Sequence, residues 1–213
     1  PLPGGHWLEP SAGAGHIVKA VNAWCSRGNV LLGSASRPSR WSGAELNEAY
    51  RGALSPSVRP LYIGDFLRAP CAFALGCDVA IGNPPYELAM EFVLGARRRA
   101  RVVAFLLRAN FLGSEERQAF WQRDMPDIYM LPNRPTFTVT KKRDPRTGAV
   151  KTTSSDSCEY AWFVWPELAP GEVRRRGHIE VLDVTPDKIR AEWRARAPVV
   201  TIGAEAAPVE APA

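Results

Sequence analysis

The sequence predicts an α/β fold in which a mostly parallel sheet carries helices on both faces. Short apolar runs alternate with amphipathic stretches, which is the pattern of strands joined by crossover helices. Residues 101–108 (RVVAFLLR) form a continuous apolar run, as expected for a parallel strand buried on both faces. Residues 159–165 (EYAWFVW) are rich in aromatic and branched side chains and give the strongest strand signal in the chain.

The elements follow in order from the N-terminus. Residues 6–9 are typical of the end of a strand, and residues 10–15 form a turn of small residues. A helix is expected over 16–27, because apolar side chains recur there at helical spacing. Residues 28–40 are polar and predict a loop. Further strands are expected at 41–46, 60–64, 78–82, 101–108, 127–131 and 159–165.

Helices are expected between these strands. A short helix runs through Leu54, and a second one spans residues 87–98. A third is expected over 114–125, since Ser114 is a favourable N-cap and the two following glutamates suit the first turn.

Three segments lie outside this alternation. Residues 132–158 are basic and rich in Thr and Ser, and a loop of this length inside a domain is usually functional or disordered. Residues 178–183 are a further candidate strand whose pairing the sequence leaves open. We expect one domain over residues 1–196 and a disordered tail, rich in Ala, Pro and Glu, over 197–213.

The composition excludes several classes of protein. The 213 residues are 46% apolar, as in a globular domain, and the net charge of +5 permits a polyanionic partner without requiring one. Four cysteines without paired spacing and only three histidines predict neither a metal site nor a disulfide framework. No apolar run approaches the length of a membrane span and no signal peptide is visible, so a cytoplasmic location is expected.

A glycine-rich turn joins the first strand to the first helix. Glycines in the segment Glu9–Gly15 (EPSAGAG) allow a sharp turn and the close approach of a ligand. The spacing is not the dinucleotide fingerprint, because Val18 stands where a third glycine is needed. The Glu9 carboxylate would suit the ammonium group of an amino-acid moiety. A tight turn with an incidental acid explains the segment equally well.

Acidic residues also end the second and third strands. Glu45 can accept hydrogen bonds from both hydroxyls of a ribose, although taken alone it is more simply a solvated charge at a helix N-terminus. Asp65 can accept a bond from an adenine amino group, with Phe66 against the ring. A turn aspartate followed by a core phenylalanine is the alternative for this pair.

The tetrapeptide Asn83–Tyr86 (NPPY) is the most informative feature of the chain. It lies between an apolar run and an amphipathic stretch, and therefore on the loop that leaves a strand, where open α/β sheets bind ligands. Two prolines fix the backbone and remove two donors. The stiff turn that remains can accept hydrogen bonds from a planar amino group while its ring stacks on the heterocycle. An Asn-Pro turn without chemical meaning is the alternative.

In their order along the chain, these segments resemble class I S-adenosylmethionine-dependent methyltransferases of the DNA adenine-N6 type. The blocks FLLRANFLGSEERQAFW, LPNRPTF and EYAWFVW resemble phage-encoded members in particular, and the resemblance covers roughly residues 6–166. It implies a Rossmann-like methyltransferase sheet of about seven strands with an antiparallel last strand, S-adenosylmethionine as cofactor, and no metal. The cofactor-binding residues that it implies are Glu9, Pro10, Ser11, Gly13, Gly15, Glu45, Leu46, Asp65, Phe66 and Asn83.

The resemblance further implies methyl transfer to adenine N6 of a base flipped out of double-stranded DNA, in the cytoplasm of a bacterial host. The Asn83 side-chain oxygen and the Pro84 carbonyl would accept the amine hydrogens, Pro85 would stiffen the loop, and Tyr86 would stack on the base. The oligomeric state stays open, and a monomer fits. Residues expected to contact DNA, unless their segment is merely a solvated hairpin, are Arg134, Phe137, Lys141, Lys142, Arg143, Arg146 and Lys151.

Other interpretations of the motif stay open. Protein glutamine methyltransferases and RNA methyltransferases use the same NPPY chemistry on a planar amino group. A truncated module that binds nucleic acid without catalysis is a third possibility. In the family, an upstream segment helps to cover the methionine end of the cofactor. Because this chain begins at Pro1, we expect that an upstream part is missing.

Overall fold

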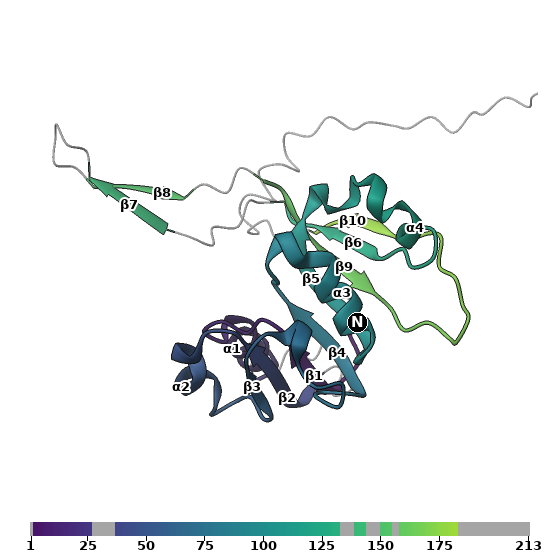
Figure 1. Ribbon diagram of the computed structural model, residues 1–213. Helices are drawn as coiled ribbons and strands as arrows, with labels where there is room; N and C mark the ends of the chain where they lie inside the picture. The colour runs from purple at the N-terminus through teal and green to yellow at the C-terminus, as the bar shows by residue number, and fades with distance from the viewer. Residues whose placement is uncertain (1, 27–36, 133–138, 144–149, 155–157, 183–213) are drawn as a thin grey trace, which may run out of the picture. The chain divides into compact units, whose positions relative to one another are not determined.

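The chain forms an eight-stranded sheet and a two-stranded hairpin, both drawn in Figure 1. The computed structural model describes residues 2–26, 37–132, 139–143, 150–154 and 158–182. The order of strands in the large sheet is β10-β6-β9-β5-β4-β1-β2-β3. Its strands are β1 (Gly5–Glu9), β2 (Pro38–Glu45), β3 (Leu61–Ile63), β4 (Cys77–Gly82), β5 (Ala100–Arg108), β6 (Asp127–Met130), β9 (Tyr160–Trp165) and β10 (Ile179–Val181).

One strand, β9, runs against its neighbours. β1 pairs in parallel with β2 and β4, and the same direction continues to β3 and β5. β9 lies antiparallel between β5 and β6, so that Phe163 is opposite both Phe105 and Ile128. These pairings confirm the predicted sheet, mostly parallel with one antiparallel strand. β10 pairs in parallel with β6 and adds an eighth strand, which assigns the pairing that the sequence left open.

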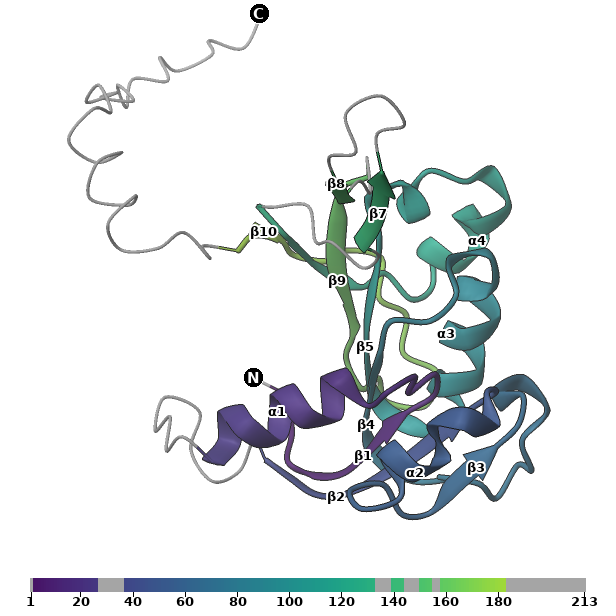
Figure 2. The same ribbon diagram turned by 90° about the vertical axis from the view of Figure 1, so that its left-hand side faces the viewer.

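The helices cover both faces of the sheet, as predicted. Figure 2 shows α1 on one side of the central strands and α3 and α4 on the other. Short 3-10 turns precede or follow several of them. The α-helices of the described chain are α1 (His16–Ser26), α2 (Arg51–Leu54), α3 (Ala89–Arg97) and α4 (Gln118–Trp121).

Each face of the sheet has its own hydrophobic core, because successive strand residues point to opposite sides. Leu8 and Phe105 belong to the core that also contains the buried side of α3. Trp7 and Ile81 belong to the core beneath α1, where Val18 is buried. The same strands therefore anchor helices on both sides, and their carboxyl ends are held at one edge.

Close packing fixes α3 against the sheet. The Phe92 ring lies 5.4 Å from the Phe66 ring, centroid to centroid, and Val93 and Ala96 are fully buried. A side chain at Gly95 would place a Cβ only 3.1 Å from Phe66, so glycine permits this approach. Burying one such Phe or Val side chain contributes about 1.5–3 kcal/mol. The packing also holds the loop that enters α3, which carries the NPPY tetrapeptide.

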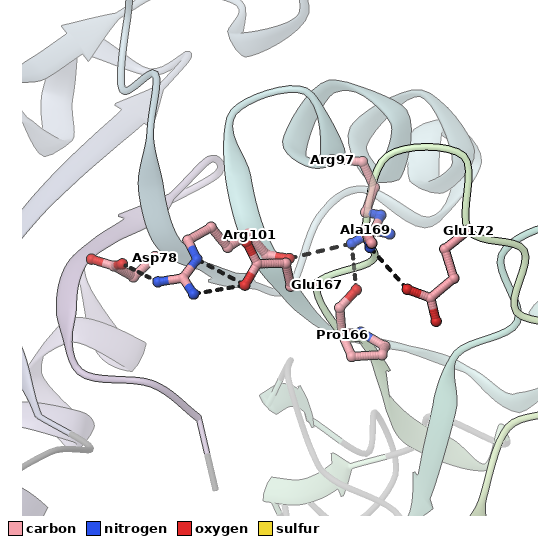
Figure 3. A network of polar contacts seen from close by, with 7 residues as sticks. All are labelled: Asp78, Arg97, Arg101, Pro166, Glu167, Ala169 and Glu172. Carbon is pink, nitrogen blue, oxygen red and sulfur yellow. Dashed lines mark hydrogen bonds and ion pairs between the residues drawn. The ribbon is translucent and has the colours of Figure 1, made fainter.

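A polar network joins α3, β4 and β5 to the chain after β9 (Figure 3). The Arg97 guanidinium donates to Asp124 at 2.9 Å and to the Pro166 carbonyl at 2.8 Å. Arg101 pairs with Asp78 at 3.3 Å and with Glu167 at 2.7 Å. The Arg97–Asp124 pair is largely buried, whereas the Arg101 pairs are exposed to solvent, which weakens their contribution to stability.

Two boundaries differ from the prediction. The helix expected over 114–125 is shorter: a 3-10 turn, η7 (Glu115–Arg117), leads into α4, which ends at Trp121. Residues 123–125 instead bond to Arg174, through Arg174 N to Arg123 O and Met125 N to Arg174 O. Ser114 occupies the N-cap position, but its side chain makes no capping bond. β2 begins at Pro38, inside the loop expected over 28–40, and pairs with β1. Most of that predicted loop, residues 28–36, lies outside the described residues.

The basic segment 132–158 contains the hairpin of β7 (Val139–Arg143) and β8 (Val150–Ser154). The two strands are antiparallel, with Lys142 opposite Lys151. Arg134, Phe137 and Arg146 lie outside the described residues, as does the tail predicted over 197–213. The predicted domain limits, 1–196, stay a prediction.

Candidate active site

A cavity of about 790 Å³ opens at the carboxyl ends of the parallel strands. Such an edge is where open α/β sheets bind ligands. Its walls come from the loops that follow β1, β2, β3, β4 and β5, which are distant in sequence. Of the predicted site residues, the cavity brings together Pro10, Ser11, Gly13, Glu45, Leu46, Asp65, Phe66, Asn83, Pro84, Pro85 and Tyr86. Glu9 and Gly15 are absent from its lining.

The glycine-rich turn bends tightly over the end of β1. Gly13 and Gly15 both have positive φ angles, of 50° and 72°, which other residues rarely adopt. At Gly13 a Cβ would meet nothing within 4 Å, so this glycine leaves space beside the cavity. At Gly15 a Cβ would lie 3.0 Å from Leu54, so this glycine serves the packing of α2. The two glycines therefore have different roles.

Glu45 connects the glycine-rich turn to the end of β2. One carboxylate oxygen accepts from the Gly13 amide at 2.6 Å, and the other accepts from the Asn47 amide at 2.8 Å. A carboxylate has about four lone-pair positions, so each oxygen can still accept a bond from a ligand. Leu46, the next residue, is 74% exposed and lines the cavity. The arrangement offers a fixed acceptor beside an exposed apolar side chain.

Glu9 lies beneath this turn and is only 2% exposed. Burial raises the pKa of the Glu9 carboxyl to about 8; the Val18 amide, which donates to it, acts in the opposite direction, and the neighbouring Glu45 adds to the rise. One Glu9 oxygen, Oε2, has no hydrogen-bond partner in the described part of the chain. Glu9 therefore contributes a buried, partly satisfied carboxyl below the cavity floor.

Asp65 and Phe66 follow β3 on the opposite wall. Asp65 Oδ1 accepts from the Leu67 amide at 2.9 Å and so caps a 3-10 turn, η4 (Phe66–Arg68). The Phe66 ring is 2% exposed and carries the Arg99 guanidinium 4.9 Å from its centroid. The structure thus places Phe66 mainly in the core, with an edge at the cavity.

The NPPY tetrapeptide forms the wall next to β4. Ser11 Oγ donates to the Asn83 carbonyl at 3.4 Å, which links this wall to the glycine-rich turn. The Leu88 amide donates to the Pro85 carbonyl at 3.1 Å and closes the 3-10 turn η5 (Tyr86–Leu88). Asn83 Oδ1 is buried and has no hydrogen-bond partner among the described residues. The described residues therefore leave this acceptor at the cavity wall unsatisfied.

An aromatic ring and a guanidinium group lie next to Tyr86. Its ring centroid lies 5.5 Å from that of the buried Tyr160, and the Arg108 guanidinium lies over the ring at 4.7 Å. Arg108 ends β5 and lines the cavity, and the sequence interpretation did not single it out. The position of Arg108 at the end of a strand is the sequence feature that could have identified it as a site residue. Asn47, Gly64, Leu88 and Phe92 are the other lining residues that were missed.

The described residues contain neither a cluster of metal-ligating side chains nor a membrane-spanning helix. No group of three or more His, Cys, Asp or Glu side chains there could hold a metal ion. In the same part of the chain, no helix has the length and apolar character needed to cross a membrane.

No family model matches the chain, and no curated protein matches its sequence significantly. Among solved structures, a class I S-adenosylmethionine-dependent methyltransferase from Listeria monocytogenes aligns with a TM-score of 0.59 at 14% identity. The alignment covers 91% of this chain and 63% of that one. The chain has the Rossmann-like fold of methyltransferases. It spans less than two thirds of the length of this neighbour.

Two further structures align less well. A modification subunit of a type I restriction enzyme from Vibrio vulnificus has a TM-score of 0.48 and 13% identity, over 91% of this chain and 49% of that one. An RNA methyltransferase from Pyrococcus horikoshii has a TM-score of 0.45 and 15% identity, over 77% and 75% of the two chains. Likeness at this level does not identify a substrate.

Proposed function

We propose that the chain is an S-adenosylmethionine-dependent methyltransferase that acts on adenine N6 of a flipped-out base in double-stranded DNA. The observation that carries this proposal is the buried Asn83 Oδ1, for which the described residues supply no donor. A buried acceptor left without a donor costs about 1–3 kcal/mol. An amino group bound in the cavity would supply the missing N–H.

The NPPY wall suits a planar amine. The nitrogen lone pair of adenine N6 is delocalised into the ring, so the amine is a weak nucleophile. Acceptors at Asn83 Oδ1 and the Pro84 carbonyl would hold its two hydrogens and localise the lone pair. The Pro85 carbonyl is engaged by the Leu88 amide, which keeps the turn in shape. Tyr86 would hold the plane of the base by stacking.

The residues of the glycine-rich side fit the cofactor. Glu45 has acceptor capacity for ribose hydroxyls, Asp65 for an amino group, and Gly13 leaves open space where a Cβ would stand. Glu9 Oε2, which has no hydrogen-bond partner among the described residues, would accept a donor from a group bound above it, and a cationic group there would lower the pKa of the carboxyl. When bound, S-adenosylmethionine supplies a methyl group and leaves as its thioether, while the amine gives up one proton. The protein contributes position and electrostatics.

DNA is the substrate favoured by charge. The hairpin strands β7 and β8 carry Lys141, Lys142, Arg143 and Lys151, and the whole chain has a net charge of +5. Lys and Arg side chains neutralise phosphates and supply sequence-independent affinity. We therefore assign the segment 132–158 to DNA contact within this proposal.

The test is a methyl-transfer assay with labelled S-adenosylmethionine and three acceptors: duplex DNA, RNA and a glutamine-containing peptide. We expect label in DNA, located at N6 of adenine after digestion, and none with the Asn83→Ala variant. Label in RNA or peptide alone would replace DNA as the substrate while retaining the chemistry. Cofactor binding without transfer to any acceptor would favour a non-catalytic module.

A further inference from the structure

A second cavity, of about 280 Å³, adjoins the candidate active site. Tyr86 and Arg108 line both cavities, so the two share a wall. The second cavity is completed by Asn110 and Arg117, from the 3-10 turns that follow β5, and by Glu87. Its lining is therefore richer in cationic and amide groups than in acids.

Arg117 is held in place by neutral groups. Its Nε donates to the Phe111 carbonyl at 2.9 Å, and its guanidinium lies 4.6 Å from the centroid of the Phe111 ring. Within the described residues, no carboxylate lies within ion-pair distance of Arg117, in contrast to Arg97 and Arg174. The charge of Arg117 is thus oriented without being neutralised by a described acid.

The platform under Arg117 is rigid. Phe111 is 6% exposed and meets Trp121 and Phe163 edge to face, at centroid distances of 5.4 and 5.5 Å. Arg117 is consequently positioned before any ligand arrives, which reduces the entropy that a ligand contact would cost. A planar guanidinium fixed in this way suits a bidentate contact with an oxyanion.

We propose that this second cavity binds a phosphodiester group next to the target nucleotide, with Arg117 and Asn110 as its ligands. This inference rests on the proposed function, since it places the target base against Tyr86. Because the two cavities share this wall, a strand phosphate next to that base would reach the adjoining cavity. Glu87, which is exposed, disfavours an anion on its own side and restricts the phosphate to the Arg117 side. A glutamine side chain brings no phosphate, so the cavity selects nucleic acid over protein.

The experiment compares Arg117→Gln with Arg117→Lys and with a control, Arg123→Gln, which removes an exposed charge from the neighbouring turn. Affinity for a fluorescent DNA duplex is measured across a salt series. We expect Arg117→Gln to weaken binding about tenfold and to reduce the log–log salt slope by about 1. Arg117→Lys keeps the charge and should retain the slope. Arg123→Gln should change affinity less than about twofold.

A second arm identifies the phosphate. In a duplex whose adenine-flanking phosphates are neutral methylphosphonates, Arg117→Gln should cause no further loss of affinity. The assignment would be overturned if Arg117→Gln and the methylphosphonates lowered DNA affinity additively. It would also be overturned if Arg117→Gln and Arg123→Gln weakened DNA binding equally. The proposed function fails by a different result, namely that the native chain transfers no methyl group to any nucleic acid.

Discussion

Two side chains near the cavity, Asn83 and Glu9, each keep a buried oxygen without a hydrogen-bond partner in the described structure. They differ in what they can do. Asn83 lines the cavity, so a ligand can satisfy its oxygen. Glu9 lies below the lining, where its carboxyl is buried and its pKa is raised to about 8. We therefore expect Asn83 to affect methyl transfer and Glu9 to make the stability of the fold depend on pH.

Replacing Asn83 with alanine should abolish transfer while cofactor binding persists. Loss of one preorganised polar contact typically lowers the rate by ~10²–10³. The glycine-rich turn and Glu45 should keep their places, because the hydrogen bond that links Asn83 to that turn uses the Asn83 main-chain carbonyl. Single-turnover rates and calorimetric cofactor affinity measure the two effects. Turnover near the native rate would remove Asn83 from the chemistry.

Glu9 should make the folded chain less stable as pH rises. Its pKa is raised from 4.5 to about 8, so between these values the folded chain retains a proton that the unfolded chain releases. The contribution of Glu9 to the free energy of unfolding is fully present below pH 4.5 and is lost as the pH rises toward 8. A shift of this size corresponds to about 5 kcal/mol. Glu9→Gln should remove the dependence and be the more stable protein above pH 8.

Chemical denaturation of the native chain and Glu9→Gln at pH 5, 7 and 8.5 measures this effect. The difference in free energy of unfolding should grow with pH. A difference that stays constant across the series would mean that Glu9 has an ordinary pKa in the folded protein.

At the scale of elements, β10 depends on one close backbone approach. A Cβ at Gly177 would lie 1.8 Å from the Pro126 carbonyl oxygen, which precedes β6. Backbone atoms cannot yield as a flexible side chain can, so Gly177→Ala should displace β10 and destabilise the fold by roughly 1–3 kcal/mol. Gly52→Ala in α2, where a Cβ meets nothing within 4 Å, is the matched control and should be neutral or slightly stabilising.

Thermal unfolding of both variants tests this expectation. The melting temperature should fall in Gly177→Ala alone, and cofactor affinity should stay native, since β10 lies at the far edge of the sheet from β3. Equal melting temperatures would show that the chain near Gly177 can shift at little cost.

The elements also show what a sequence can predict. The positions of the strands along the chain and of NPPY followed from apolar runs and prolines, because these patterns are local. The true end of α4 at Trp121 depends on bonds to Arg174, which is distant in sequence. Likewise, Arg117 is defined by its contact with Phe111, and neither residue belongs to a recognisable motif. Local patterns therefore predicted the sheet and most of the cavity, whereas the second cavity required tertiary contacts.

At the scale of the whole molecule, the question is where the positive charge acts. The net charge of +5 would attract any polyanion, wherever the charges lie. The proposed function instead assigns DNA contact to the segment 132–158, whose hairpin carries Lys141, Lys142 and Arg143 in β7. These two explanations differ in which charges matter, so they can be separated by variants of equal net charge.

Changing Lys141, Lys142 and Arg143 together to glutamine lowers the net charge from +5 to +2. If all three contact phosphates, the log–log slope of affinity against salt should flatten by roughly two to three units, at about 0.9 per contact. Cofactor affinity should not change, because the residues proposed to bind the cofactor come from other loops. Affinity for duplex DNA across a salt series measures the slope.

The control replaces three exposed arginines of the main body, Arg123, Arg175 and Arg176, with glutamine, and so reaches the same net charge. Long-range attraction depends on total charge, and it would weaken binding equally in both triple variants. Counterions are released only where cationic side chains touch phosphates. If the hairpin makes these contacts, the salt slope should therefore flatten in the hairpin variant alone. Parallel slopes for native chain and hairpin variant would assign these charges to a solvated surface. DNA affinity would then have to come from the active-site edge, where Arg117 is the first candidate.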